Sequence, residues 1–239
     1  MEFQGTIGVI GAMDEEIELL KREIAPVKDF EEGGSIFYSG KREGMRIVLL
    51  KCGIGKVNAA IGTTLLISRF QPDYVINTGT AGALQETLSR GDTVISTRVV
   101  HHDVDATAFG YAPGQVPRMP DYYTADPRLV ELAQEASLRQ KGGRVICGII
   151  ATGDSFMSDR EKTQRLRDTL PAAAAVEMEA AAVAQVCYQF STPFVIIRSI
   201  SDLAGDDSAG SFSSFLHSAA ETSASLVIRV VERLSLLEG

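Results

Sequence analysis

The fold class is decided by the segment Phe194-Val195-Ile196-Ile197-Arg198-Ser199-Ile200-Ser201-Asp202. Its first four residues are continuously apolar, which is typical of a strand buried on both faces of a parallel sheet. Polar residues follow at once, and in open α/β sheets ligands bind outside the carboxyl ends of the strands. The segment therefore predicts a buried strand with functional groups at its end.

Short apolar runs alternate with helical patterns along the rest of the chain, which predicts an α/β fold with a largely parallel sheet covered on both faces. The predicted strands are Thr6–Ile10, Ile36–Ser39, Arg46–Lys51, Tyr74–Asn77, Thr93–Val99, Val145–Ile150, Ala174–Val176 and Phe194–Ile197. The predicted helices are Met13–Ile24, Lys56–Phe70, Pro127–Arg139, Arg160–Asp168, Glu179–Phe190 and Phe212–Leu237. Because no linker or repeat interrupts this pattern, we expect residues 1–239 to form a single domain.

Composition excludes several classes of protein. The 239 residues carry 23 basic and 31 acidic side chains, a net charge of −8 without a basic run, so we expect no nucleic-acid partner. No apolar stretch approaches the roughly 20 residues that span a bilayer, and the first residues lack the features of a signal peptide. The three separated cysteines, Cys52, Cys147 and Cys187, favour a reducing cytoplasm over a disulfide framework.

Carboxylates gather at the ends of the predicted strands. Glu16 lies at the edge of the apolar stripe of its helix, where a functional and a structural role are equally compatible with the pattern. Glu179 shares a buried stripe with Val183 and Val186, so it needs a partner. Asp202 either turns the chain or binds a polar heterocycle. Asp14 and Glu15 are read as acids that complement the helix dipole, and Glu177 as a helix cap.

Several other segments contain part of a known functional motif, but their spacing or residue types do not match the whole motif. Gly53-Ile54-Gly55-Lys56 is not a P-loop, and Thr78-Gly79-Thr80-Ala81-Gly82 is not a dinucleotide fingerprint. His101-His102-Asp103 with Asp105 has metal-ligand residue types but no remote partner, so we expect no metal and no cofactor. A serine-hydrolase elbow is also missing. Spacing alone favours a core position for Phe156 over a stacking role.

The sequence resembles the bacterial 5′-methylthioadenosine/S-adenosylhomocysteine nucleosidases, from about Thr6 to the final helix and in the same order throughout. Single segments are shared with nucleoside phosphorylases, but the whole set is specific. The segments that carry the resemblance are Gly8–Glu16, Gly53–Ala60, Asn77–Gly82, Thr107–Tyr111, Thr152–Phe156, Val176–Ala180 and Arg198–Asp202.

The resemblance implies a phosphorylase/hydrolase-like fold, a three-layer α/β/α sandwich around a mixed, largely parallel sheet, in a homodimer. It implies hydrolysis of the N-ribosidic bond of 5′-methylthioadenosine, S-adenosylhomocysteine and 5′-deoxyadenosine, giving adenine and the 5-substituted ribose. Asp202 would protonate N7 of the leaving adenine, Glu16 would activate water, and Glu179 would bind the ribose hydroxyls. Asp202 and Glu16 therefore need different environments, which keep Asp202 protonated and Glu16 ionised before the reaction.

The resemblance also assigns the binding residues of the site. Phe156 would stack on adenine and the Met157 backbone would read its edge, while Met178 would pack on the sugar. The remaining implied binding residues are Thr80, Ala81, Gly82, Glu177, Arg198, Ser201 and Phe212, with Phe109 and Pro117 reaching the site from the partner subunit. Thr80 stands where serine is common and keeps the hydroxyl, and Met157 replaces a frequent aliphatic residue.

Two other functions remain compatible with parts of the pattern. A purine nucleoside phosphorylase would need donors for phosphate, which the acidic Asp14-Glu15-Glu16 run would repel. A non-catalytic nucleoside-binding protein would not need the pair Glu16 and Asp202. The order of preference among adenosine-like nucleosides, including aminodeoxyfutalosine, stays open. The long, partly apolar loop 101–122 is expected to cover either a site or a partner.

Overall fold

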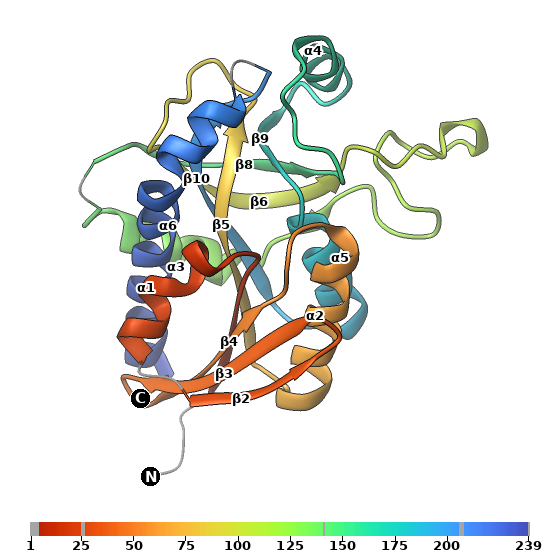
Figure 1. The fold of residues 1–239 in the computed structure, drawn as a ribbon. Helices are drawn as coiled ribbons and strands as arrows, with labels where there is room; N and C mark the ends of the chain where they lie inside the picture. Colours follow the sequence, from red (N-terminus) through yellow and green to blue (C-terminus); the bar gives the residue numbers. More distant parts are fainter. Residues whose placement is uncertain (1–4, 25–26, 141, 206–207, 239) are drawn as a thin grey trace.

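The computed structural model describes residues 5–24, 27–140, 142–205 and 208–238 (Figure 1). Within these ranges ten strands form one sheet. They are β1 Thr6–Gly11, β2 Val27–Glu32, β3 Ser35–Arg42, β4 Met45–Lys51, β5 Tyr74–Ala83, β6 Thr93–His101, β7 Tyr123–Thr124, β8 Val145–Thr152, β9 Ala173–Glu177 and β10 Phe194–Leu203. The helices are α1 Asp14–Ile24, α2 Lys56–Phe70, α3 Pro127–Ser137, α4 Arg160–Thr169, α5 Ala180–Phe190 and α6 Ser208–Glu238, with a 3₁₀ turn at Thr107–Phe109.

The sheet is mixed, as the resemblance implies, and half of it closes on itself. Parallel pairs join β1 to β4 and β5, β5 to β10, β6 to β8, and β8 to β9. Antiparallel pairs join β6 to β10 and β5 to β9, so β5, β10, β6, β8 and β9 form a barrel-like ring. Strands β1, β4, β3 and β2 extend this ring as an open sheet. The ring brings the ends of β5, β9 and β10 close together.

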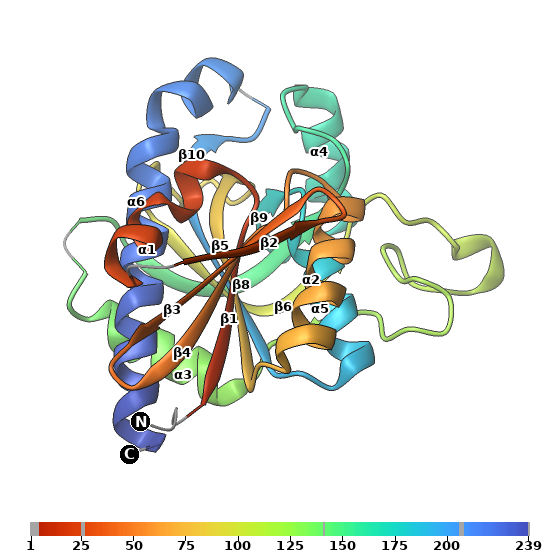
Figure 2. The ribbon, with the colours of Figure 1, turned by 60° about the horizontal axis from the view of Figure 1, so that its bottom comes forward.

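Helices cover both faces of the sheet, which confirms the predicted three-layer α/β/α class. Helix α6 packs against α1 and α3 on one face, and α2 packs against α5 on the other (Figures 1 and 2). The apolar start of β10, Phe194 to Ile197, is buried as predicted. No helix in the described part of the chain is both long and apolar enough to cross a membrane.

The structure differs from the predicted elements mainly at strand ends. The sequence prediction missed β2, an edge strand rich in charge, which is held to the sheet where Phe30 stacks on Phe37 with ring centroids 4.5 Å apart. Strand β5 continues six residues beyond the predicted end at Asn77, because its small residues fit between β10 and β9. The 101–122 loop projects from the body beside α2 and α5 (Figure 2).

Candidate active site

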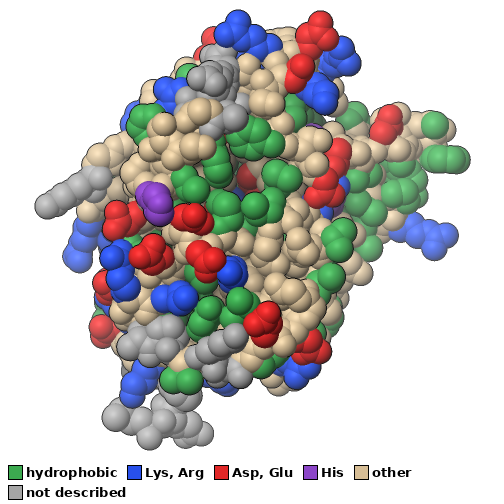
Figure 3. Space-filling model, viewed as in Figure 1, with side chains coloured by type: hydrophobic (Ala, Val, Ile, Leu, Met, Phe, Trp, Pro, Cys, Tyr) green, Lys and Arg blue, Asp and Glu red, His purple; other side chains and the backbone are tan. Residues whose placement is uncertain are grey.

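A cavity of about 270 Å³ opens at the carboxyl ends of β1, β5, β9 and β10. Figure 3 shows it as a hollow bordered by hydrophobic side chains in the upper centre of that face. Its size and mixture of apolar walls with a few polar groups are typical of a small-molecule site. The lining residues are Ala12, Met13, Glu16, Ile54, Thr80, Ala81, Gly82, Ser155, Phe156, Met157, Val176, Glu177, Met178, Glu179, Ser201, Asp202, Ala204 and Phe212.

Glu16 is buried in the first turn of α1, and its carboxylate turns back toward the start of the helix. Oε2 accepts hydrogen bonds from the backbone N–H of Ala12 at 2.8 Å and of Met13 at 3.3 Å. Oε1 accepts from the N–H of Thr80 at 3.0 Å and from the Thr80 hydroxyl at 3.4 Å. Four donors therefore fix one orientation of the carboxylate against the cavity.

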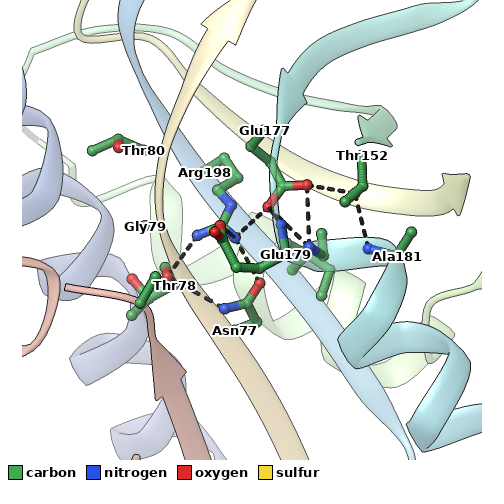
Figure 4. Close-up of polar contacts among 12 residues, drawn as sticks. Asn77, Thr78, Gly79, Thr80, Thr152, Glu177, Glu179, Ala181 and Arg198 are labelled. Atoms are coloured by element: carbon green, nitrogen blue, oxygen red, sulfur yellow. Dashed lines mark hydrogen bonds and ion pairs between the residues drawn. The ribbon is translucent and has the colours of Figure 1, made fainter. Parts of the chain in front are cut away.

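Arg198 of β10 is completely buried beneath the cavity and binds groups from β5, β9 and the start of α5 (Figure 4). Nη1 donates to the carbonyl of Thr78 at 2.7 Å, and Nη2 donates to Oδ1 of Asn77 at 2.9 Å. Nη2 also forms ion pairs with Glu177 and, at 3.4 Å, with Glu179. A buried guanidinium requires such partners, because the loss of its hydration is otherwise uncompensated.

Glu177 caps helix α5 and also forms an ion pair with Arg198. Its carboxylate accepts from the N–H of Glu179 at 3.0 Å and of Ala180 at 2.9 Å, and from the Thr152 hydroxyl. The cap predicted for Glu177 is therefore present, and a tie to Arg198 is added to it. These bonds fix the point at which the chain turns from β9 into α5.

Glu179 projects into the cavity from the start of α5. Its Oε1 accepts the N–H of Gly55 at 2.8 Å, which ties α5 to the loop before α2. Burial raises the pKa of Glu179 to about 8, the nearby Glu177 carboxylate adds to this, and Arg198 opposes it. Three buried carboxylates, counting Glu16, thus surround a single guanidinium, and the cluster has an excess of negative charge.

Asp202 lies across the cavity, next to a register shift between β10 and β5. Burial raises the pKa of Asp202, because its ionised form loses hydration, while a hydrogen bond from the Ser201 hydroxyl at 2.9 Å opposes the rise. Gly82 allows this close packing, since a Cβ there would lie 3.0 Å from Asp202 Oδ1. The raised pKa favours the protonated form, which a proton donor needs.

Aromatic side chains line the cavity entrance. Phe156 is 43% exposed and meets Phe212 edge-to-face, with ring centroids 5.6 Å apart. The core position that spacing favoured for Phe156 is therefore wrong, because the loop after β8 carries the ring to the cavity. Met157 is buried beside it, and its carbonyl accepts the N–H of Gly205 at 2.9 Å.

The structure brings together most of the residues singled out in the sequence. Arg198 does not line the cavity but holds the acids that do, and Phe109 and Pro117, which belong to the 101–122 loop, do not line the cavity of their own chain. Sequence reasoning missed Asn77, whose strand position gave no sign of a role. It also missed Ile54, which lies in the segment Gly53–Ala60 that carries the resemblance but from which no site residue was named. The other lining residues missed were Ala12, Met13, Ser155, Val176 and Ala204.

The histidine-rich segment at the end of β6 forms structural contacts. His101 Nε2 lies 3.0 Å from Oε1 of Gln185, and Asp103 pairs with Lys56 at 2.6 Å. Among the described residues, no group of three or more His, Cys, Asp or Glu side chains is placed to hold a metal ion.

Comparison with known proteins places this geometry in a family. Residues 6–232 match the phosphorylase superfamily. The 5′-methylthioadenosine/S-adenosylhomocysteine nucleosidase of Geobacillus kaustophilus is 54% identical over 223 residues, which cover 93% of this chain and 95% of the relative. The corresponding enzyme of Neisseria meningitidis, solved with methylthio-immucillin-A, superposes with a TM-score of 0.93 at 48% identity, covering 96% of this chain and 99% of that one. Futalosine hydrolase of Helicobacter pylori has a TM-score of 0.90 at 34% identity, with coverage of 96% and 98%.

Proposed function

The chain belongs to the phosphorylase superfamily and, within it, to the 5′-methylthioadenosine/S-adenosylhomocysteine nucleosidases, and from this premise we propose how its residues perform the reaction. It is a hydrolase that cleaves the N-ribosidic bond of these two nucleosides. The observation that carries the mechanism is the pair of buried acids, Glu16 and Asp202, which line one cavity in contrasting hydrogen-bond environments.

Asp202 supplies the proton that adenine needs in order to leave. Adenine is a poor leaving group as an anion, so protonation at N7 by the Asp202 carboxyl lowers the barrier. The raised pKa of Asp202 supports this role, because the proton is retained until the bond breaks. The C–N electron pair goes to the purine ring, and positive charge develops on the ribose.

Glu16 activates the water that attacks C1′ of the ribose. Its four donors keep both carboxylate oxygens in place, and the ionised form takes a proton from water as the new C–O bond forms. Glu179, which lines the same cavity, binds the ribose hydroxyls. The carboxylates of Glu16 and Glu177 outnumber the single Arg198 guanidinium, and this local negative charge stabilises the cationic sugar in the transition state.

Water rather than phosphate is the nucleophile. The side chains that line the described cavity include four carboxylates and no lysine, arginine or histidine. Arg198, the nearest guanidinium, is buried behind the wall and occupied by Thr78, Asn77 and the glutamates. A phosphate dianion would therefore meet repulsion at the position that water occupies.

Adenine and 5′-thio groups fit the two ends of the cavity. Phe156 offers an exposed ring face on which adenine stacks, near Met157, Ser201 and Asp202. Met13, Ile54 and Phe212 supply the apolar surface for a methylthio or longer group, and 5′-deoxyadenosine fits the same surface. The likeness to a futalosine hydrolase makes aminodeoxyfutalosine the second candidate substrate.

A homodimer completes the site. Supporting this, Val57 and Ile61 on α2 and Tyr188 on α5 expose apolar surface on one face. The 101–122 loop is anchored to α2 through Asp103 with Lys56, and β7, which follows the loop, contacts α5 through Tyr123 with Tyr188. Phe109 on that loop is 83% exposed, and in the dimer it reaches the partner's cavity together with Pro117.

The remaining proposals concern the whole chain. All 239 residues act as a single nucleosidase domain, since one sheet includes strands from both halves of the chain. The enzyme works in the cytoplasm, which suits three cysteines that form no disulfide. No cofactor takes part in the mechanism.

Adenine release from 5′-methylthioadenosine, measured in phosphate-free buffer and again with added phosphate, tests the proposed nucleophile. We expect equal rates in both buffers and a free reducing sugar as co-product. Release that requires phosphate would overturn the reading of Glu16 as a base for water. Intact nucleoside after long incubation would support a binding protein instead.

A further inference from the structure

One buried serine of helix α6 ties together the two central strands behind the cavity. Ser223 is completely buried, and its hydroxyl donates to the carbonyl of Ile197 in β10 at 3.0 Å. The same oxygen accepts the N–H of Gly79 in β5 at 3.2 Å and lies 2.7 Å from the Thr78 hydroxyl, which donates to it. The donor and both acceptor positions of the serine hydroxyl are thus used.

On the β5 side, Ser223 binds the residue next to the one that binds Glu16. Gly79 precedes Thr80, whose N–H and hydroxyl both bind Glu16 Oε1. A Cβ on Gly79 would lie 1.9 Å from Arg198 Nη1 and 2.5 Å from Glu16 Oε1. Both charged groups therefore pack directly against the Gly79 backbone, and movement of that backbone moves them.

The β10 side of the tie leads to Arg198. Ile197, which accepts the serine hydroxyl, is the residue before Arg198 in β10. The carbonyl of Thr78 accepts Arg198 Nη1, and the hydroxyl of Thr78 contacts Ser223. The Ser223 hydroxyl therefore bonds to the backbone of both β5 and β10, the two strands that carry Thr80 and Arg198.

We propose that Ser223 is a positioning residue for hydrolysis, which acts by fixing Gly79 and Thr80 so that Glu16 is held at the attacking water. It does not line the cavity, so it acts through other groups and does not touch the substrate. The proposal rests on the proposed function of Glu16. A misplacement of about 1 Å at a reacting group costs roughly 100-fold in rate, so a small backbone shift is sufficient.

Another buried serine on the same helix provides a matched control. Ser235 lies three turns further along α6, and its hydroxyl donates only to the carbonyl of Glu232 in its own helix, at 2.7 Å. Replacement of either serine by alanine removes one buried hydroxyl from α6. Only the change at Ser223 removes a bond to the strands.

The test compares Ser223→Ala and Ser235→Ala with the wild type, using 5′-methylthioadenosine and melting temperatures. We expect Ser223→Ala to lower kcat by roughly 10-fold to 100-fold with KM within about threefold of the wild-type value. Ser235→Ala should keep both constants. If the alanine variant at Ser223 does not fold, Ser223→Cys, which has a similar volume and a weak hydrogen-bonding group, replaces it with the same expected loss.

Each result supports or overturns the proposal. Wild-type kcat in Ser223→Ala, a loss equal to that of Ser235→Ala, or a rise in KM as large as the fall in kcat would overturn it. Wild-type turnover is measured first, with and without phosphate. A failure there concerns the proposed function, whereas normal wild-type turnover with an unaffected Ser223→Ala variant refutes only this inference.

Discussion

At the scale of single residues, the site separates two carboxylic acids by their surroundings. Glu16 receives four hydrogen-bond donors, which are three backbone N–H groups, of Ala12, Met13 and Thr80, and the Thr80 hydroxyl. Asp202 accepts a hydrogen bond from the Ser201 hydroxyl, and burial raises the pKa of its carboxyl. The contrast assigns the base to Glu16, whose charge is supported by several donors, and the acid to Asp202, which has fewer.

Asp202→Asn tests the proton donor. The amide keeps the size of the side chain but cannot protonate adenine, so we expect kcat to fall by about 10²–10⁴-fold with KM nearly unchanged. Steady-state kinetics on 5′-methylthioadenosine measure both constants, and Asp168→Asn on the exposed face of α4 serves as the control. Turnover by Asp202→Asn within a few-fold of the wild type would remove Asp202 from the mechanism.

The raised pKa of Glu179 predicts that the free energy of unfolding depends on pH. Its pKa rises from 4.5 to about 8 in the folded protein, so folding takes up a proton between these values. Stability from this group is fully present below pH 4.5 and is lost as pH rises toward 8. Glu179→Gln should therefore gain stability over the wild type at pH 8, by about 1–2 kcal/mol or roughly 2–8 °C, and gain nothing at pH 4.

Melting temperatures from pH 4 to pH 8 measure this difference. Glu161→Gln, at an exposed position of α4 paired with Arg165, provides the control, because it should show little change with pH. If the melting temperatures of Glu179→Gln and the wild type differed by the same amount at every pH, Glu179 would be ionised in the folded protein.

The sequence predicted the acids of the site better than the residues that hold them. Glu179 was recognisable, because a carboxylate on an apolar helical stripe is anomalous. Asn77 and Ser223 are ordinary residues in strand and helix patterns, and their roles arise only where β5, β10 and α6 meet. Phe156 was misplaced, because the path of a loop is not encoded in residue spacing.

At the scale of elements, helices were predicted more accurately than strands. Helix α2 has the predicted bounds, since a period of 3.6 residues persists over its whole length. The ends of β5 and β10 were predicted too short, because Gly, Thr and Ser in these strands resemble a loop. Their strand geometry comes from neighbours far away in the chain, such as β9 beside Gly82 and Ala83.

Asp126→Ala tests the cap of α3 independently of catalysis. The Asp126 side chain accepts the N–H of Leu129 at 3.0 Å, and Pro127 opens the helix. Loss of such a cap costs about 1 kcal/mol, or roughly 2–4 °C in a chain of this size. Calorimetry should show this loss with kcat unchanged, and Asp126→Ser, which keeps a capping oxygen, should recover most of it. Equal melting temperatures for all three proteins would contradict the prediction.

At the scale of the whole molecule, the proposed homodimer would complete the cavity with residues that its own chain does not supply. Val57 is 69% exposed on α2, and Phe109 lies on a loop anchored to that helix through Lys56 and Asp103. An apolar face of this kind is typical of an interface. Dimerisation and closure of the 5′-thio pocket are therefore expected to depend on the same surface.

Two variants separate dimerisation from the pocket. Val57→Glu places a charge in the interface, so we expect monomers by light scattering and a loss of activity. Phe109→Ala should remain dimeric and raise KM for 5′-methylthioadenosine on the order of 10-fold, because it removes one apolar wall. Leu138→Glu, at another exposed apolar position at the end of α3, should change neither property. A fully active Val57→Glu monomer would show that one chain suffices, and the loop would then need another role.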